Sequence, residues 1–390
     1  RWTGYARNFL WLVGPLCVSY LDVGNVDRDM LAGRRYSHML KRQEGIIMIF
    51  LCLLPSSILY AQTPTTAQAD DSSYIVEPVG EEAYWALAQF LDYDKGQPLD
   101  VRIVEKIEEE TYIREKIVFS GVRGDRVPGY LAFPTSGTGP YPVVLCLHGL
   151  SGDKERWWQD DSFESGGLVT KELLKKGFAV LSLDAQFHGE RIANNDYGSP
   201  FNVLFSTQST KLREMYLQTV IEYRMALDYL AMRTEVDTSR TGIIGLSMGG
   251  TMTFLLTAVE PRIKTAVACV TSPVGVTQFR EFKDAFQNVM DRTANRFRGL
   301  AATPQFRELA TTPQFRAMAV APQNYAHAIG SRSFLMLMAR NDDFYTEKEA
   351  RQLFELIPSP TKELKFYNSG HQLPPEYVSK AIQWFEDHLK

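Results

Sequence analysis

From residue 141 to residue 390, short apolar runs alternate with amphipathic stretches, and this alternation constrains the fold more than any other feature. Runs this short and without polar interruption are typical of strands buried on both faces of a parallel sheet. Six strands are therefore expected, at Val143–Leu147, Phe178–Leu183, Thr241–Leu246, Ala266–Val270, Phe334–Met338 and Leu364–Tyr367.

Between these runs, apolar residues recur at steps of three and four, as one buried face of a helix requires. The longest such stretch contains Leu212, Met215, Tyr216, Val220, Tyr223, Leu227 and Leu230. A last helix is expected after Pro374-Pro375, with Val378, Ile382, Phe385 and Leu389 buried. Strands alternating with helices predict the α/β class, with a doubly wound, mostly parallel sheet.

The sequence before this region predicts a different local structure. A short helix is expected around Glu81–Leu91, and two β-like runs, Tyr112–Phe119 and Arg126–Phe133, flank the turn SGVRGD. Their spacing favours an antiparallel hairpin in front of the parallel sheet.

The first 73 residues read as targeting sequence and linker. Residues 39–61 contain a short basic segment, a short apolar segment and Ala61 as a small residue before a cut, which predicts a secretory signal peptide. The alternative is a membrane anchor, but Pro55 interrupts the apolar run well short of the roughly 20 residues that a spanning helix needs. Residues 1–38 are interpreted as translated upstream sequence or a disordered leader, and the polar residues 62–73 as a linker. We therefore expect a secreted or periplasmic protein whose folded domain spans 74–390.

Charge and cysteine content exclude several classes. The 390 residues are 45% hydrophobic and 23% charged, with a formal net charge of −4 and no basic block. Such a surface has no footprint for nucleic acid, nor for a membrane once the signal is removed. Of the four cysteines, Cys146 and Cys269 lie in apolar runs and are expected to be buried free thiols.

One segment departs from the strand–helix alternation. TPQFR occurs at 303–307 and again at 312–316, and APQNY follows at 321–325. A local duplication inside a helical, lid-like insertion at 275–330 is the interpretation.

The stretch GIIGLSMGG carries the first chemical signal. Ser247 follows a predicted strand and precedes a predicted helix, with Gly245 and Gly249 on either side. A nucleophile elbow needs this context, because the turn that displays the serine is too tight for larger neighbours. A structural turn is the alternative.

A nucleophilic serine needs a histidine base, and a carboxylate that orients that base. His371 lies in a loop after the last predicted strand, at the sheet edge where Ser247 is expected; His148 and His188 follow strands at the same edge. Asp342 and Asp343 follow the fifth strand. The order Ser247, Asp342, His371 is that of an α/β-hydrolase triad, with Asp343 as the alternative acid.

With these residues in place, residues 112–390 resemble the α/β-hydrolase superfamily, and in particular secreted esterases near the dienelactone-hydrolase and acetyl-xylan-esterase branches. The segments that carry the resemblance are HGLSGDK, DAQFHGER, EVDTSRTGIIGLSMGG, ARNDDFYT and the closing SGH. The resemblance implies an oxyanion hole formed by the backbone N–H groups of Leu150 and Met248. Ala339 stands where such proteins usually have glycine, and the serine nucleophile argues against dienelactone hydrolase activity itself.

The resemblance also suggests a substrate pocket. His148 and His188 are candidates to line it, with a structural role as the alternative. Trp157 and Trp158 are further candidates, with aromatic core or lid packing as the alternative. No motif for a metal, a dinucleotide or a phosphate is present, so no cofactor is expected.

The predicted function is that of a serine esterase acting on small-molecule or carbohydrate esters, with acetylated carbohydrate as the first substrate class. A serine peptidase of the prolyl-oligopeptidase type that lacks its propeller is the alternative. A catalytically silent hydrolase fold used for binding is the rival from another class. The sequence does not indicate an oligomeric state.

Overall fold

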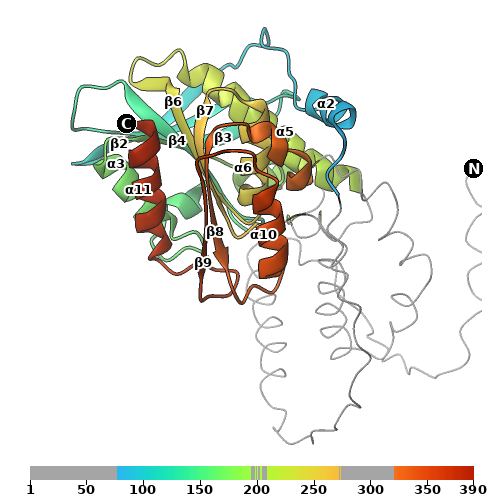
Figure 1. The fold of residues 1–390 in the computed structure, drawn as a ribbon. Coiled ribbons are helices and arrows are strands. Elements are labelled where there is room, and N and C mark those ends of the chain that lie inside the picture. Colours follow the sequence, from blue (N-terminus) through green and yellow to red (C-terminus); the bar gives the residue numbers. More distant parts are fainter. Residues whose placement is uncertain are drawn as a thin grey trace, which may run out of the picture. The chain divides into compact units, whose positions relative to one another are not determined.

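The computed structural model describes residues 77–194, 209–271 and 320–390, and the single residues 198, 200, 203 and 273. Within this part, nine strands form one sheet in the order β1-β2-β3-β5-β4-β6-β7-β8-β9 (Figure 1). The strands are β1 (Arg102–Glu108), β2 (Tyr112–Ser120), β3 (Arg126–Pro134), β4 (Tyr141–Leu147), β5 (Ala179–Leu183), β6 (Val236–Leu246), β7 (Ile263–Cys269), β8 (Ser333–Ala339) and β9 (Lys362–Tyr367).

The six strands from β5 to β9 in this order run parallel to one another. They correspond to the six predicted apolar runs. β4, β5, β7 and β8 are buried along nearly their whole length, and β6 is buried from Thr241 to Leu246. Burial on both faces is the physical reason that these segments show no alternation of polar and apolar residues. The predicted parallel sheet is confirmed.

The other end of the sheet is antiparallel. β2 and β3 form the predicted hairpin, and β3 then pairs antiparallel with β5. β1 adds a further antiparallel strand at the outer edge and was not predicted. Its sequence, RIVEKIE, is almost entirely exposed, so it lacks the apolar pattern from which a strand is recognised.

Helices cover both faces of the sheet (Figure 1). α3 (Gly166–Lys175) and α11 (Tyr377–Leu389) pack against each other on one face, and α5 (Ser209–Leu230) and α6 (Met248–Val259) pack on the other. α2 (Glu81–Gln89) precedes the sheet, and α10 (Glu347–Glu355) contacts β8. The four residues predicted to be buried on the last helix, Val378, Ile382, Phe385 and Leu389, all lie in the core.

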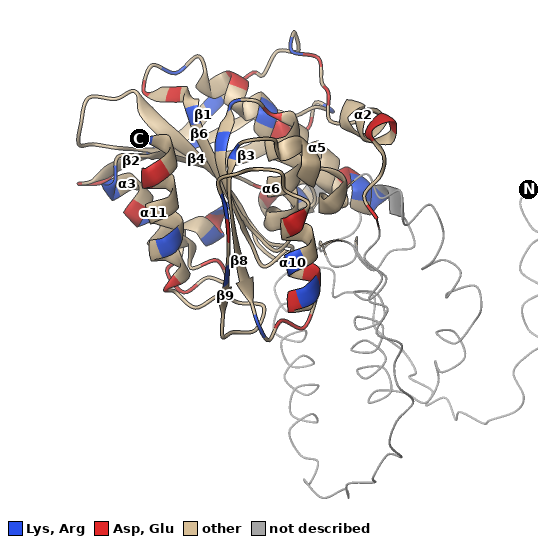
Figure 2. Cartoon of the chain, in the orientation of Figure 1, with Lys and Arg blue, Asp and Glu red and all other residues tan. Residues whose placement is uncertain are grey.

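The surfaces of these helices carry both signs of charge. Acidic and basic side chains are interspersed along α3, α10 and α11 rather than gathered in a stripe (Figure 2). None of the helices in the described residues has the length and apolar composition needed to cross a bilayer.

Parts of the sequence-based interpretation fall outside the described residues. The leader 1–38, the signal peptide 39–61, the linker 62–73 and most of the insertion 275–330 stay predictions. The described end of the insertion, 320–330, contains the 3₁₀ turns η3 (Pro322–Asn324) and η4 (Ala326–Ile329). This end contacts α6, and Tyr325 and Ile329 are fully buried in the core.

Candidate active site

Ser247 lies in the tight turn between β6 and α6. Its backbone has φ 55° and ψ −114°, outside the regions that a residue with a side chain normally adopts. A Cβ at Gly245 would lie 2.2 Å from the Gly249 carbonyl oxygen, and one at Gly249 would lie 2.2 Å from that of Leu147. Only glycine fits at both positions, so the strand–turn–helix geometry predicted for a nucleophile elbow is present.

The turn places Ser247 at the carboxyl edge of the sheet, where His371 and Asp342 also lie. His371 Nε2 is 2.9 Å from Ser247 Oγ, and His371 Nδ1 is 2.8 Å from Asp342 Oδ2. These contacts fit a tautomer in which Nδ1–H donates to the carboxylate and Nε2 accepts from the serine hydroxyl. The three residues follow three different strands: Ser247 follows β6, Asp342 follows β8 and His371 follows β9. In space they form a chain of hydrogen-bond contacts from Asp342 through His371 to Ser247.

The two candidate acids, Asp342 and Asp343, differ in burial and in hydrogen bonding. The Asp342 side chain is fully buried, and its Oδ1 accepts a hydrogen bond from the Phe344 N–H at 2.9 Å. Asp343 is exposed. Burial and the Asp342 carboxylate raise the pKa of Tyr345, so its hydroxyl stays protonated beside the acid. Of the two, Asp342 is therefore the carboxylate that the structure places within hydrogen-bond distance of the His371 imidazole.

Two aromatic rings pack against His371. Phe163 and Phe344 lie 5.5 Å and 4.5 Å from the imidazole, measured between ring centroids. They leave the His371 side chain 20% exposed. Neither was predicted: Phe344 is close to Asp342 in sequence, which is a usable signal, whereas nothing in the sequence marks Phe163.

The two segments that carry the predicted oxyanion donors both approach Ser247. Met248 is the first residue of α6, and the first N–H groups of a helix have no acceptor within the helix. Leu150 follows β4, and the preceding Gly149 approaches the serine closely enough that a Cβ there would lie 3.7 Å from Ser247 Cβ. The loop after β4 and the start of α6 thus flank the nucleophile from two sides.

The structure places His148 and His188 in the interior, so the structural alternative holds for both and their assignment to a substrate pocket is corrected. Both are buried behind the loop, with exposed fractions of 2% and 0%. His148 Nε2 accepts from the Ala185 N–H, its Nδ1 lies 2.8 Å from the Gly149 carbonyl oxygen, and His188 Nε2 lies 2.5 Å from that of Leu150. Burial lowers the pKa of His148 to about 4 and that of His188 to about 3. They brace the loop from the interior.

The tryptophans also belong to the packing of the domain. Trp157 is fully buried, so its assignment to a pocket is wrong and the core alternative holds. Trp158 is half-buried against Tyr112 and Tyr130, with the Arg114 guanidinium 4.7 Å from its ring centroid. This contact lies on the antiparallel strands β2 and β3.

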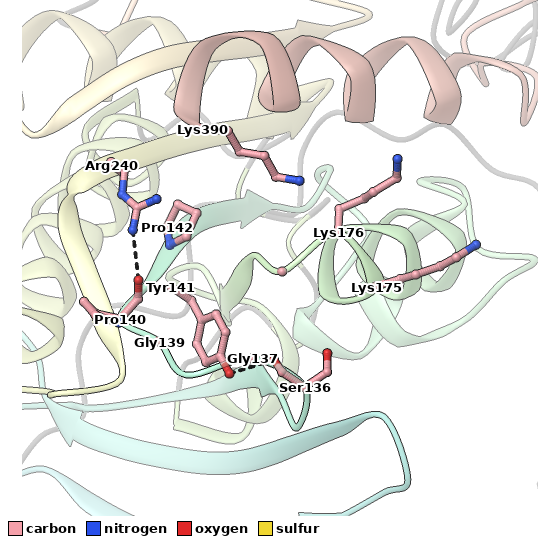
Figure 3. Close-up of a pocket in the computed structure, with 11 residues that line it drawn as sticks. Ser136, Gly137, Gly139, Pro140, Tyr141, Pro142, Lys175, Lys176, Arg240 and Lys390 are labelled. Carbon is pink, nitrogen blue, oxygen red and sulfur yellow. Dashed lines mark hydrogen bonds between the residues drawn. The ribbon is translucent and has the colours of Figure 1, made fainter.

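A cavity of about 460 Å³ lies at the opposite, amino edge of the sheet (Figure 3). Lys175, Lys176, Arg240 and Lys390 line it, and each is paired with a carboxylate. No residue of the Ser247 site lines this cavity, so it is separate from the candidate active site.

Within the described residues, no group of three or more His, Cys, Asp or Glu side chains could hold a metal ion.

A sheet of this topology with a serine on the β6–α6 turn defines the α/β-hydrolase fold. The sequence matches the family model described as acetyl xylan esterase (AXE1) over residues 81–287, just over half of the chain. The chain belongs to this family, which confirms the predicted branch and agrees with the predicted class of enzyme, the carboxylic ester hydrolases. Residues 220–387 also match the model described as BAAT / acyl-CoA thioester hydrolase C terminal.

Individual relatives agree with this placement. The chain is 28% identical over 181 residues to the Bacillus subtilis protein YtaP, covering 45% of this chain and 58% of that one. It is 26% identical over 202 residues to the acetyl esterase Axe7A of Xylanibacter ruminicola, covering 50% and 44%. The chain thus spans about half the length of the curated relatives it matches.

A solved structure shares the fold. Acetyl xylan esterase 1 from Thermoanaerobacterium sp. superposes with a TM-score of 0.61 at 18% identity, covering 80% of this chain and 95% of that one.

Proposed function

We propose that the protein is a serine esterase, with Ser247 as nucleophile, His371 as general base and acid, and Asp342 as the residue that orients His371. The observation that carries this proposal is the chain of two hydrogen bonds from Asp342 through His371 to Ser247 Oγ. Family membership supports the same reaction class.

In the proposed mechanism, His371 takes the Ser247 proton as the hydroxyl attacks the ester carbonyl. The N–H groups of Leu150 and Met248 stabilise the oxyanion, and donors of this kind contribute about 3 kcal/mol each. His371 then protonates the departing alcohol, and water activated by His371 hydrolyses the acyl-enzyme.

We extend the proposal to acetyl esters of carbohydrates as substrates and to secretion as the destination. The acetyl xylan esterases among the similar proteins support the first. The pattern of residues 39–61 supports the second. Secretion is tested by sequencing the N-terminus of protein recovered outside the cytoplasm, where a start after Ala61 is expected. Full-length protein confined to the cytoplasm would contradict it.

The catalytic proposal is tested with purified protein and its Ser247→Ala variant on p-nitrophenyl acetate and on Gly-Pro-p-nitroanilide. We expect ester cleavage that is lost in the variant, and no anilide cleavage. Efficient anilide cleavage would favour the serine peptidase instead. Ester cleavage that survives in Ser247→Ala would show that this serine is not the nucleophile.

Acetylated xylo-oligosaccharides and the longer-chain ester p-nitrophenyl butyrate then test the substrate class. We expect release of acetate from the oligosaccharides and a lower kcat/KM for butyrate than for acetate. Absence of acetate release would remove the carbohydrate substrate while leaving the esterase proposal in place.

A further inference from the structure

The segment Ser162–Glu164 lies between two loops that carry different parts of the site. Its Phe163 ring packs against His371, and its Glu164 side chain accepts a hydrogen bond from the Gly149 N–H at 3.0 Å. The Tyr377 hydroxyl, at the start of α11, donates to the Glu164 carbonyl oxygen. One short segment thus contacts both the loop after β4 and the loop after β9, which are separated in the sheet by β6, β7 and β8.

The contact with Gly149 fixes a peptide next to the predicted oxyanion donor. The Gly149 carbonyl and the Leu150 N–H belong to one planar trans peptide, so they point in opposite directions. The carbonyl lies 2.8 Å from His148 Nδ1 and accepts from the Gly152 N–H at 3.0 Å. With the Gly149 N–H held by Glu164, both sides of Gly149 are anchored and the direction of the Leu150 N–H is set.

Burial of Glu164 at this position lowers the stability of the folded protein. Glu164 is 1% exposed, and burial raises the pKa of its carboxyl group. Among the described residues, its second oxygen, Oε2, has no hydrogen-bond partner. An unpaired buried carboxyl oxygen costs stability, and an apolar side chain would avoid that cost. The feature that an apolar side chain could not reproduce is the hydrogen bond to the Gly149 N–H.

We infer that Glu164 is a positioning residue, which holds the loop after β4 so that the Leu150 N–H faces the oxyanion formed at Ser247. The inference rests on the proposed esterase function. It assigns Glu164 no contact with the substrate: the residue acts through Gly149. Its expected signature is a loss of transition-state stabilisation with little loss of substrate binding.

The test compares Glu164→Leu, which removes the acceptor, with Glu164→Gln, which keeps an oxygen acceptor of the same reach. Glu172→Gln on α3 is the matched control, because it neutralises an exposed carboxylate paired only with the neighbouring Lys175. The kcat and KM for p-nitrophenyl acetate are measured for each variant, together with the Tm. Inhibition by phenylboronic acid reports on the oxyanion hole, because its serine adduct is an anionic tetrahedral boronate that mimics the tetrahedral intermediate.

We expect Glu164→Leu to lower kcat by about 10- to 100-fold. This fall should not exceed the fall in kcat that removal of one oxyanion donor causes. KM should change less than about threefold, and the inhibition constant of the boronic acid should rise with the fall in kcat. Glu164→Gln should keep kcat within about threefold, and Glu172→Gln should behave as the unaltered protein. If Glu164→Leu does not fold, Glu164→Asp, which withdraws the carboxylate from Gly149, takes its place.

An unchanged kcat in folded Glu164→Leu would overturn the inference, as would an equal loss in Glu164→Leu and Glu164→Gln. A fall in Tm without a change in kcat would likewise overturn it and leave a purely structural role. Ser247→Ala is assayed alongside. If Ser247→Ala is inactive and Glu164→Leu is fully active, only this inference fails; if Ser247→Ala is active, the esterase mechanism itself fails.

Discussion

The two edges of the parallel sheet differ in how their charged groups are paired. At the amino edge, around the cavity of Figure 3, Arg240 pairs with Asp237, Lys175 with Glu172 and Lys390 with Glu386, each within four residues along the chain. Lys176 is the exception among the four basic residues that line this cavity, because it pairs with Glu386 across 210 residues, but its side chain is 39% exposed. At the carboxyl edge, His371 bonds to Asp342 across 29 residues and to Ser247 across 124. Short-range surface pairs are formed by any helix or turn, whereas long-range ones exist only because the fold brings distant loops together.

The difference in burial follows the same division. Arg240 is 39% exposed, so water screens its pairing. The Asp342 side chain is fully buried beneath His371, so water does not screen this carboxylate as it screens the Arg240 pair. The carboxyl edge is therefore the place where a substitution should change chemistry, and the amino edge is a place where it should not.

The largest effect is expected for His371→Ala. Loss of the base leaves Ser247 without an acceptor for its proton, so kcat on p-nitrophenyl acetate should fall by about 10⁴- to 10⁶-fold. His327→Ala, at an exposed histidine of η4, serves as the control and should leave kcat unchanged. A loss of less than about tenfold in His371→Ala would place the base elsewhere and break the contrast between the edges.

The next effect separates the two neighbouring aspartates. Asp342→Asn should lower kcat by about 10⁴-fold, because an amide at this position favours the wrong imidazole tautomer. Asp343→Asn should stay within about twofold, since that side chain is exposed. Equal losses in the two variants would mean that the acid is not fixed as the hydrogen bonds indicate.

The third prediction concerns stability, and it tests whether the buried His148 at this edge stays neutral in the folded protein. Burial holds the pKa of His148 at about 4 in the folded state, below the ordinary histidine value of about 6.5, so the unfolded chain binds more protons between these pH values. The free energy of unfolding should therefore fall as the pH drops from 6.5 to 4, by on the order of 3 kcal/mol for this group.

Urea unfolding of the protein and of His148→Asn at several pH values checks this expectation. The variant should lose part of the pH slope, whereas the exposed-histidine variant His327→Gln should keep it. An unaltered slope in His148→Asn would mean that the buried imidazole is not held neutral by the fold.

The smallest effect is expected at the amino edge. Arg240→Ala removes a partly exposed pair, so the free energy of unfolding should change by less than about 1 kcal/mol and kcat should not change. Thermal unfolding and the p-nitrophenyl acetate assay measure both quantities. A fall in kcat would show that the amino edge affects the Ser247 site, and the expected difference between the two edges would then be wrong.

Much of this organisation could be predicted without coordinates. The six parallel strands, the β2–β3 hairpin and the last helix follow from the pattern of the apolar residues. The turn at Ser247 follows from its two glycines, because their lack of a side chain is a property of the residues themselves. The strand β1 escaped prediction because an exposed edge strand has no apolar face to reveal it.

The sequence by itself determined which elements form, because periodicity and small residues act locally, and which residue types could carry a serine hydrolase site. It left open whether Asp342 or Asp343 is the acid, and whether His148, His188 and Trp157 line a pocket or pack in the interior. The tertiary structure decided these points, since burial and orientation depend on contacts between distant segments. For the same reason, the sequence did not indicate a role for Phe163 or Glu164, because they lie near His371 and Gly149 only after the chain has folded.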